Sequence, residues 1–234
     1  MRISYSSSTL FQGCQRKFWH KKKHTEIDCD ADADTTALRI GKSFHQILEN
    51  CNHERKRMKS VIIKESFEDN EIETDTQKGM IIAMCEKYLD LHEKQGLKVI
   101  GCEMEIGDDD VIGYIDAVME DANGKWYIVD LKTAGRLNNS LLSRLERDVQ
   151  LNLYTYYADQ VAKHYKLELA NVAGTRYRVT TKSTIKCGAR EKLLDFKKRC
   201  YDRLESFDIA IPATSLIPEE TWERVQEIRL KAEE

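Results

Sequence analysis

The amino-acid sequence predicts an α/β fold in which helices flank a central sheet that contains an antiparallel meander. Apolar residues recur at helical spacing in segments 35–52 and 74–95, as they do on the buried face of an amphipathic helix. Three apolar runs follow, each too short for a helix and bounded by Gly or Asp clusters, which indicates strands joined by tight turns. These runs span residues 97–106, 111–120 and 125–132.

The other segments are interpreted in the same way. Ser6–Thr9 precede apolar residues and are typical of the cap of a short N-terminal helix. The acidic stretch 26–34 is expected to be a loop. Further along the chain, the pattern predicts a long helix, a strand and another helix, at residues 140–166, 171–181 and 189–206.

The two prolines of the chain mark its expected domain boundary. Pro212 and Pro218 bracket a linker ahead of a last predicted helix at 219–233. We therefore expect one domain over residues 1–211 and a C-terminal linker and helix over residues 212–234.

The composition is that of a soluble globular protein, with 41% hydrophobic and 33% charged residues among 234. No stretch is long and apolar enough for a membrane helix, and the N-terminus lacks the apolar core of a secretory signal. We therefore expect a cytoplasmic protein, encoded by a bacterial host or a phage, with no membrane partner. The net charge of −3 does not by itself indicate a nucleic-acid partner.

Local charge and cysteine spacing add two expectations. Basic residues and aromatics interleave between Arg16 and Lys23, and residues 190–203 are again basic, a pattern that fits contact with a phosphate backbone but also an ordinary solvated face. The seven cysteines contain no CxxC pair, which argues against a disulfide framework or a zinc ribbon.

The stretch IVDLKTAG, residues 128–135, places an acid and a base at the end of a predicted strand. Side chains alternate along a strand, so Asp130 and Lys132 share one face. A second acid, Asp116, lies on the preceding predicted strand. We expect both aspartates to sit at a solvent-open strand end.

The turn between these strands decides whether the two aspartates face each other. A two-residue Asn-Gly turn pairs Asp116 with Leu131, whereas a three-residue loop with a left-handed Gly124 pairs Asp116 with Asp130. One residue of slip inverts every side chain of the strand. We predict the three-residue loop, with both aspartates on one face.

Two carboxylates across such a ladder are about 5 Å apart at their Cα atoms and can both reach one hard divalent cation. Oxygen ligands with an open water position suit Mg²⁺ or Mn²⁺. A neighbouring lysine can orient or deprotonate an attacking water, so the pattern indicates metal-assisted phosphodiester hydrolysis. The alternative is an Asp130–Lys132 salt bridge at a strand end, with Asp116 independently exposed.

Five short motifs follow one another along the chain. They are Ser-x-Ser-x-x-Leu with a cysteine and a basic-aromatic tail (5–19), Gly-Lys-Ser-Phe-His (41–45), Gly-Tyr-Ile-Asp (113–116), Asp-Leu-Lys-Thr (130–133) and Gln-Leu-Asn-Leu-Tyr (150–154). In this order they resemble the RecB-like branch of the PD-(D/E)XK nuclease superfamily. The resemblance implies a restriction-endonuclease-like core with a central mixed sheet.

The resemblance implies a role for each matching residue. His45, Asp116, Asp130 and the Leu131 carbonyl would bind metal, and Lys132 would be the catalytic lysine. Gln150 and Tyr154, one helical turn apart, would contact DNA or orient the lysine. Substrate contacts are further expected from Ser6, Ser8, Arg16, Lys17 and Tyr157. Glu103 and Glu105 are both candidates for an additional acid, and the sequence does not choose between them.

Ordinary structural readings compete with several of these roles. A lone histidine such as His45 is commonly a core residue, and Ser6 and Ser8 can cap a helix as readily as contact a phosphate. Many RecB-like relatives hold an iron–sulfur cluster, but beyond the Gln-x-x-x-Tyr motif this chain has only Cys187 and Cys200 to join Cys14. We expect no iron–sulfur cluster.

The leading functional hypothesis is a stand-alone, Mg²⁺- or Mn²⁺-dependent deoxyribonuclease of phage or bacterial recombination and repair. No appended DNA-reading module is visible, which favours an exonuclease acting on single- or double-stranded DNA ends. A recombinase, a helicase or a single-strand-binding protein is the expected kind of partner. The alternatives are a nuclease acting on RNA or CRISPR-related intermediates, and a non-catalytic protein that binds DNA or a partner.

Overall fold

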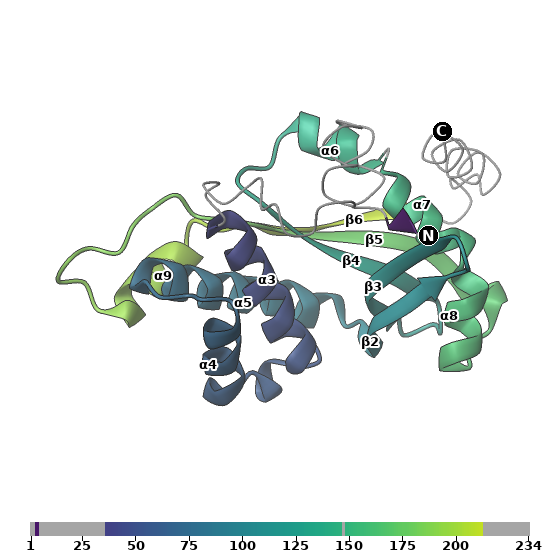
Figure 1. Cartoon of the computed structure of the whole chain (residues 1–234), viewed down its shortest axis with the longest axis horizontal. Coiled ribbons are helices and arrows are strands. Elements are labelled where there is room, and N and C mark those ends of the chain that lie inside the picture. The colour runs from purple at the N-terminus through teal and green to yellow at the C-terminus, as the bar shows by residue number, and fades with distance from the viewer. Residues whose placement is uncertain (1–2, 5–35, 147, 213–234) are drawn as a thin grey trace.

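The computed structural model describes residues 3–4, 36–146 and 148–212 as a mixed sheet with helices on both faces (Figure 1). The helices are α3 (Thr36–Asn50), α4 (Ser60–Asp69), α5 (Asp75–Gln95), α6 (Asn139–Glu146), α7 (Val149–Tyr156), α8 (Ala158–Tyr165) and α9 (Leu193–Tyr201). The strands are β1 (Ile3–Ser4), β2 (Lys98–Gly107), β3 (Val111–Glu120), β4 (Trp126–Ala134), β5 (Val172–Thr181) and β6 (Ser206–Pro212).

The described strands form one sheet in the order β1-β3-β4-β5-β6, with β2 paired to β3. The β2–β3–β4 meander is antiparallel, as predicted. β5 runs parallel to β4, and β6 runs antiparallel to β5. The sheet is therefore mixed, and the expected α/β class with a central mixed sheet, an antiparallel meander and flanking helices is confirmed.

A fork opens between β3 and β4, and it positions the candidate site. β4 pairs with the second half of β3, from Ala117 to Glu120. The first half of β3 pairs with β1 instead, at Val111 and Ile112. The two strands of the meander therefore separate at Asp116, where the backbone groups of the sheet are open to side chains and ligands.

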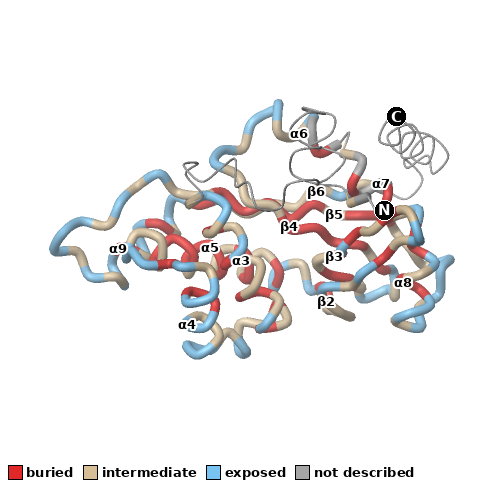
Figure 2. The backbone as a smooth tube through the Cα atoms, in the orientation of Figure 1, coloured by how far each residue is buried: buried red, intermediate tan, exposed pale blue. Residues whose placement is uncertain are grey.

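Two apolar clusters hold the layers together, one on each face of the sheet. The strands between them are buried over much of their length (Figure 2). The first joins α3, α5 and α9 to Ala117, Met119, Val129 and Leu131. The second joins α7 and α8 to alternate residues of the same strands, such as Val118 and Ile128. Burial on both faces explains why these strands read as nearly continuous apolar runs.

The predicted helices at 35–52 and 74–95 are confirmed as α3 and α5. Thr74 and Gln77 form a capping box at the start of α5, and Gly96 ends the helix in a left-handed conformation with a φ of 62°. These local signals are why the bounds of α5 agree closely with the sequence.

The predicted long helix at 140–166 is wrong, because the chain forms three short helices there, α6, α7 and α8. Asp148 has an extended backbone and its side chain accepts a hydrogen bond from the Gln150 N–H, which starts α7 afresh. At Tyr157 the backbone leaves the helical region, with a ψ of 21°, and α8 begins. The apolar periodicity continues across both breaks, so it did not reveal them.

Two further elements differ from the prediction. The helix expected at 189–206 is confined to α9, and the chain then forms β6 on the edge of the sheet beside β5. Helix α4 was not predicted, because its apolar residues do not follow a helical stripe and its buried residues are only Ser66 and Phe67.

Several expectations lie outside the described residues: the N-terminal helix after Ser6–Thr9, the loop at 26–34 and the C-terminal helix at 219–233. Within the described part of the chain, every helix is too short or too polar to traverse a lipid bilayer.

Candidate active site

The end of β4 places Asp130 and Lys132 on the face of the sheet covered by α7. Asp130 is 2% exposed and follows Ile128, which belongs to the α7 and α8 cluster. Leu131, between them, packs on the opposite face with α3 and α5. The shared face expected from strand alternation is confirmed for this pair, but Asp130 is buried, so its expected solvent-open position is wrong.

The predicted register between β3 and β4 is confirmed. Gly124 has a φ of 75°, and the Asp121 N–H donates to the Lys125 carbonyl, as a three-residue loop requires. The last pair of the ladder is Ala117 with Val129. Asp116 and Asp130 are the next residues on the two strands and therefore stand opposite each other at the fork.

The side chains of the two aspartates nevertheless contact different layers. Alternation breaks at Asp116, because Ile115 packs in the α7 cluster while Ala117 packs in the α3 cluster. Glu103, across from Asp116 on β2, has a φ of 48°, a left-handed conformation that accompanies the break. The expectation that both carboxylates share one face is therefore wrong in this structure.

Asp116 occupies the fork itself. Its Oδ2 accepts a hydrogen bond of 2.6 Å from the Leu131 N–H, and its Oδ1 lies 3.6 Å from Nδ1 of His45 on α3. Its side chain is 17% exposed. The alternative of an independently exposed Asp116 does not hold, although an Asp130–Lys132 ion pair is present, with Nζ 2.8 Å from Oδ2.

Gln150, on α7, links the acid and the base of β4. Its Oε1 accepts from Lys132 Nζ at 2.8 Å, while its Nε2 donates to Asp130 Oδ1 at 2.8 Å and to the Tyr154 hydroxyl at 2.7 Å. The Tyr154 hydroxyl in turn donates to the Tyr114 carbonyl. If the Gln150 amide were rotated by 180°, its NH₂ group would face the Lys132 ammonium and its oxygen would face the Asp130 carboxylate. Both contacts would be unfavourable, so the network fixes the orientation of Gln150.

The charges of this site push the pKa values of the two aspartates apart. Burial and the nearby Asp116 charge raise the pKa of Asp130 to about 7 against the opposing effect of Lys132. Burial also acts to raise the pKa of Asp116, but His45, the Leu131 N–H and Lys132 bring it below its ordinary value. Burial acts to lower the pKa of His45, but Asp116 and then Asp130 raise it. The Asp116 carboxyl therefore ionises readily, whereas the Asp130 carboxyl, with a pKa of about 7, loses its proton only around neutral pH.

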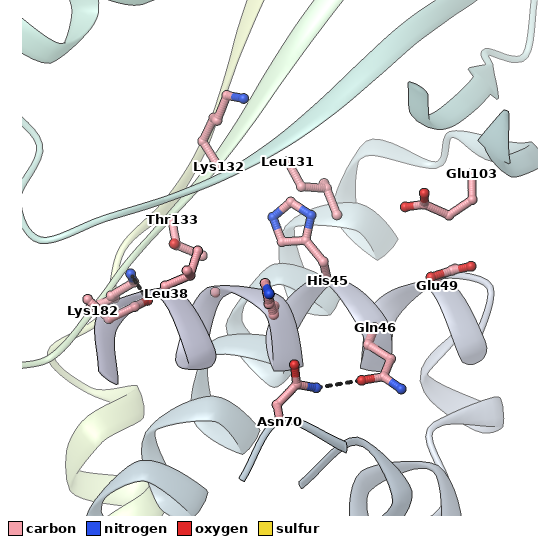
Figure 3. Close-up of a pocket in the computed structure, with 13 residues that line it drawn as sticks. Leu38, His45, Gln46, Glu49, Asn70, Glu103, Leu131, Lys132, Thr133 and Lys182 are labelled. Carbon is pink, nitrogen blue, oxygen red and sulfur yellow. Dashed lines mark hydrogen bonds between the residues drawn. The ribbon is translucent and has the colours of Figure 1, made fainter. Parts of the chain in front are cut away.

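A cleft of about 730 Å³ adjoins this group on the α3 side of the sheet (Figure 3). His45 and Leu131 lie near its middle, and Glu49 and Glu103 lie together at one end. Its lining comprises Ala37, Leu38, Gly41, Lys42, His45, Gln46, Glu49, Asn70, Glu103, Leu131, Lys132, Thr133 and Lys182.

The structure distinguishes the two candidates for an additional acid. Glu103 lines the cleft, and partial desolvation together with Asp116 and Glu49 raises its pKa to about 7. Both glutamates are exposed, but Glu105 is not part of the cleft lining and accepts a hydrogen bond from the Tyr114 hydroxyl. Glu103 is therefore the acid that faces the candidate site.

The donor types at the fork are those that a hard divalent cation takes. It offers two carboxylates and an imidazole, and Asp130 Oδ2 is a buried oxygen with no directed hydrogen bond, although Lys132 Nζ is close. Within residues 36–146 and 148–212, no three side chains of His, Cys, Asp or Glu converge closely enough to hold an ion. The donors thus surround the fork without meeting at one point, and the Leu131 carbonyl stays a predicted ligand.

Burial changes the expected roles of the aromatic residues and of Gln150. Gln150 is 9% exposed, Tyr154 2% and Tyr157 4%. The Tyr157 hydroxyl donates to Asp108 on the β2–β3 turn. The polar groups of these three residues are engaged inside the protein, and of the two roles expected for Gln150 and Tyr154 the geometry favours orienting Lys132. The expected substrate contact of Tyr157 stays a prediction.

The expected substrate surface lies in part outside the described residues. Ser6, Ser8, Arg16, Lys17 and Cys14 lie outside the described residues. In α9, Lys197 pairs with Glu86 and Arg199 pairs with Glu191, so these two basic side chains are engaged within the protein.

Two cleft residues were missed by sequence reasoning, although each carries a signal. Glu49 comes four residues after His45 on a helix, a spacing that places both side chains on one face. Lys182 directly follows β5, and the carboxyl ends of the parallel strands β4 and β5 lie at the same edge of the sheet. The pairing of β4 with β5 was needed to use the second signal.

Comparison with known proteins agrees with this architecture. A model of the PD-(D/E)XK nuclease superfamily matches residues 2–231. No curated protein matches the chain. A solved structure described as "Crystal structure of SSO0001" is 14% identical, with 94% of this chain and 87% of that chain covered and a TM-score of 0.32, values at which the likeness carries no argument.

Proposed function

The chain belongs to the PD-(D/E)XK nuclease superfamily, which supports a metal-dependent nuclease activity in general, and we propose that this activity is directed at DNA ends. The specific proposal is a Mg²⁺- or Mn²⁺-dependent deoxyribonuclease, acting as an exonuclease in phage or bacterial recombination and repair. The observation that carries it is the linked group of Asp116, Asp130, Lys132 and Gln150 at the β3–β4 fork.

The proposed metal ligands are His45, Asp116, Asp130 and the Leu131 carbonyl. A bound divalent cation supplies positive charge that stabilises the pentacovalent phosphorane and lowers the pKa of a water. Asp116 is held for this role by the Leu131 N–H, and Asp130 by the Gln150 amide. The raised pKa of Asp130 means that its proton competes with the cation below about pH 7.

Lys132 is the proposed catalytic lysine. Its ammonium is held by Asp130 and Gln150 at 2.8 Å each, so it points to a fixed position beside the fork. From there it would orient the attacking water and stabilise charge on the phosphoryl oxygen. The attacking water gives up a proton and forms a bond to phosphorus, the bond to the leaving oxygen breaks, and that oxygen takes up a proton from solvent, which gives one hydroxyl end and one phosphate end.

Gln150 and Tyr154 are proposed as positioning residues. Both side chains are buried, and their hydrogen bonds connect the Tyr114 carbonyl to Lys132. This arrangement supports a role in holding Lys132 rather than in contacting DNA.

The test is digestion of one plasmid, in matched circular and linear forms, with Mn²⁺ and with either the wild type or Lys132→Ala. We expect the wild type to degrade only the linear form, and the variant to be slower by about 10² to 10⁴, the usual contribution of a positioned proton-transfer group. Lys163→Gln, on the exposed surface of α8, is the matched control and should cleave like the wild type.

Other outcomes separate the alternatives. Cleavage of both plasmid forms would make the protein an endonuclease, and normal cleavage by Lys132→Ala would remove that residue from the chemistry. If both forms survive, an RNA substrate of the same length shows whether the protein is a ribonuclease, and survival of that too favours a binding protein.

A further inference from the structure

The cleft beside the candidate site has ends of opposite charge. Glu49 and Glu103 form one end, and Lys182 lies at the other end, past Thr133, with His45 and Leu131 between them (Figure 3). Lys42, on the exposed surface of α3, also lines the cleft. The acidic end suits a cation, whereas the basic end suits an anion, and the proposed reaction uses both.

The sheet fixes the position of Lys182 relative to Lys132. The Lys182 N–H donates to the Ala134 carbonyl at 2.7 Å, which continues the pairing of β4 with β5 beyond the ladder. Ala134 is two residues beyond Lys132, roughly 7 Å along a strand. The Lys132 ammonium contacts Gln150 on the α7 side and the Lys182 ammonium contacts Ala37 on the α3 side, yet both side chains line the cleft at this edge of the sheet.

Lys182 is a cation without an anionic partner among the described residues. Its Nζ donates to the Ala37 carbonyl at 2.9 Å, and no carboxylate of the described chain forms an ion pair with it. The side chain is half-buried, and this burial lowers its pKa. Removing a charge from water against a single neutral acceptor is unfavourable, and a bound anion would offset that cost.

We infer that Lys182, assisted by Lys42, binds the phosphate that flanks the scissile phosphodiester on one side. This inference rests on the proposed nuclease function and extends it to the path of the substrate. The strand passes from the basic end of the cleft to Lys132, and Glu49 and Glu103 repel further phosphates at the acidic end. The site therefore binds the nucleic-acid backbone on one side of the scissile bond only, as an enzyme that acts at strand ends requires.

The first experiment measures binding of a fluorescent single-stranded oligonucleotide at several salt concentrations, with Ca²⁺ in place of Mg²⁺. Lys182→Met keeps the aliphatic stem and removes the charge. Loss of one phosphate contact should lower the slope of log affinity against log salt by about 0.7. Lys42→Gln should weaken binding less, and the control Lys163→Gln should bind like the wild type.

The second experiment places a single uncharged methylphosphonate at the phosphate before or after the cut site. We expect the wild type to lose affinity, by about tenfold, for a neutral linkage on one side only. Lys182→Met should lose nothing further from that same linkage, because the contact is already absent. A full additional loss in the variant, or no effect on either side in the wild type, overturns the inference.

The outcomes distinguish this inference from the proposed function. If the wild type neither binds nor cleaves any nucleic acid, the nuclease proposal fails and the inference fails with it. If the wild type cleaves and Lys182→Met keeps the wild-type salt slope, only the inference fails. Should Lys182→Met unfold, as judged by its melting temperature, a wild-type slope in the exposed variant Lys42→Gln overturns the inference.

Discussion

Two buried polar networks lie on opposite faces of the sheet. One surrounds the acid Asp130 and includes a cation, and the other surrounds the base Arg178 and has only neutral partners. On the α7 side, Asp130 contacts Lys132 and Gln150, and its Oδ2 lacks a directed hydrogen bond. On the α5 side, fully buried Arg178 of β5 donates to Tyr88, His92 and Gln95. Arg178 is paired with Leu131 in the sheet, so the two networks are close neighbours across its plane.

The difference shows which network serves the fold. The partners of Arg178 are neutral, because burial and then Arg178 lower the pKa of His92 to about 4. Burial and then the charges of His92 and Arg178 lower the pKa of His53, which contacts Tyr88, to about 3. Neither network is complete, since Arg178 Nε and Asp130 Oδ2 both lack a hydrogen-bond partner. The difference lies in access: Arg178 is fully buried, whereas Asp130, with its pKa raised to about 7, contacts Lys132, whose side chain is 32% exposed. A buried charge among neutral partners stabilises the fold, whereas an ionisable pair that reaches the surface can bind a ligand.

The largest expected effect separates activity from stability. Asp130→Asn should reduce cleavage by about 10³-fold, because the bound metal contributes several kcal/mol and each 1.4 kcal/mol is tenfold in rate. Its melting temperature at pH 8 should equal or exceed that of the wild type, because the buried charge is removed. Cleavage rates and thermal melts without metal check both. A variant that unfolds would place Asp130 among the residues that the fold requires.

The converse variant is Arg178→Ala. It removes a fully buried side chain and leaves Tyr88, His92 and Gln95 without their donor, so unfolding should become easier by about 3 kcal/mol. The folded variant should still cleave with a near-normal kcat. Urea unfolding measures the change in the free energy of unfolding. The control is Arg190→Ala at an exposed position, whose free energy of unfolding should lie within about 0.5 kcal/mol of the wild-type value. Equal stability of the two variants would contradict a structural role for Arg178.

The smallest expected effect is a difference in pH dependence without metal. His53 and His92 stay neutral in the folded state, so the unfolded state takes up protons below pH 6.5 and stability falls. Asp130 acts in the opposite sense, because its folded pKa of about 7 lies above its unfolded value and stability rises as pH falls below 7. Asp130→Asn should therefore steepen the loss by up to about 1.4 kcal/mol per pH unit between pH 6.5 and 4.5.

This prediction is checked by urea unfolding in EDTA at several pH values. Asp159→Asn, on the exposed surface of α8, is the matched control and should follow the wild type. If Asp130→Asn also follows the wild type, the carboxyl of Asp130 does not take up its proton near neutral pH.

The sequence predicted most of what depends on neighbours along the chain. The helices α3 and α5, the antiparallel meander and its three-residue turn at Gly124 follow from periodicity, capping residues and turn chemistry. The breaks around α7 were missed because apolar spacing persists through them. Strand β6 was missed although Phe207, Ile209 and Ile211 alternate with other residues, because this short run lies between the predicted helix at 189–206 and the linker expected from Pro212.

The sequence by itself determined the family of the chain and the order of its motifs, because the motif residues and their spacing are local features. Only the tertiary structure decided which side chains meet. The fork turns Asp116 toward His45, and of the two roles expected for Gln150 the structure favours contact with Lys132. The parallel pairing of β4 with β5 carries Lys182 to the same cleft. Such contacts depend on strand order and on breaks in alternation, which are settled by the packing of whole layers and leave no local trace in the sequence.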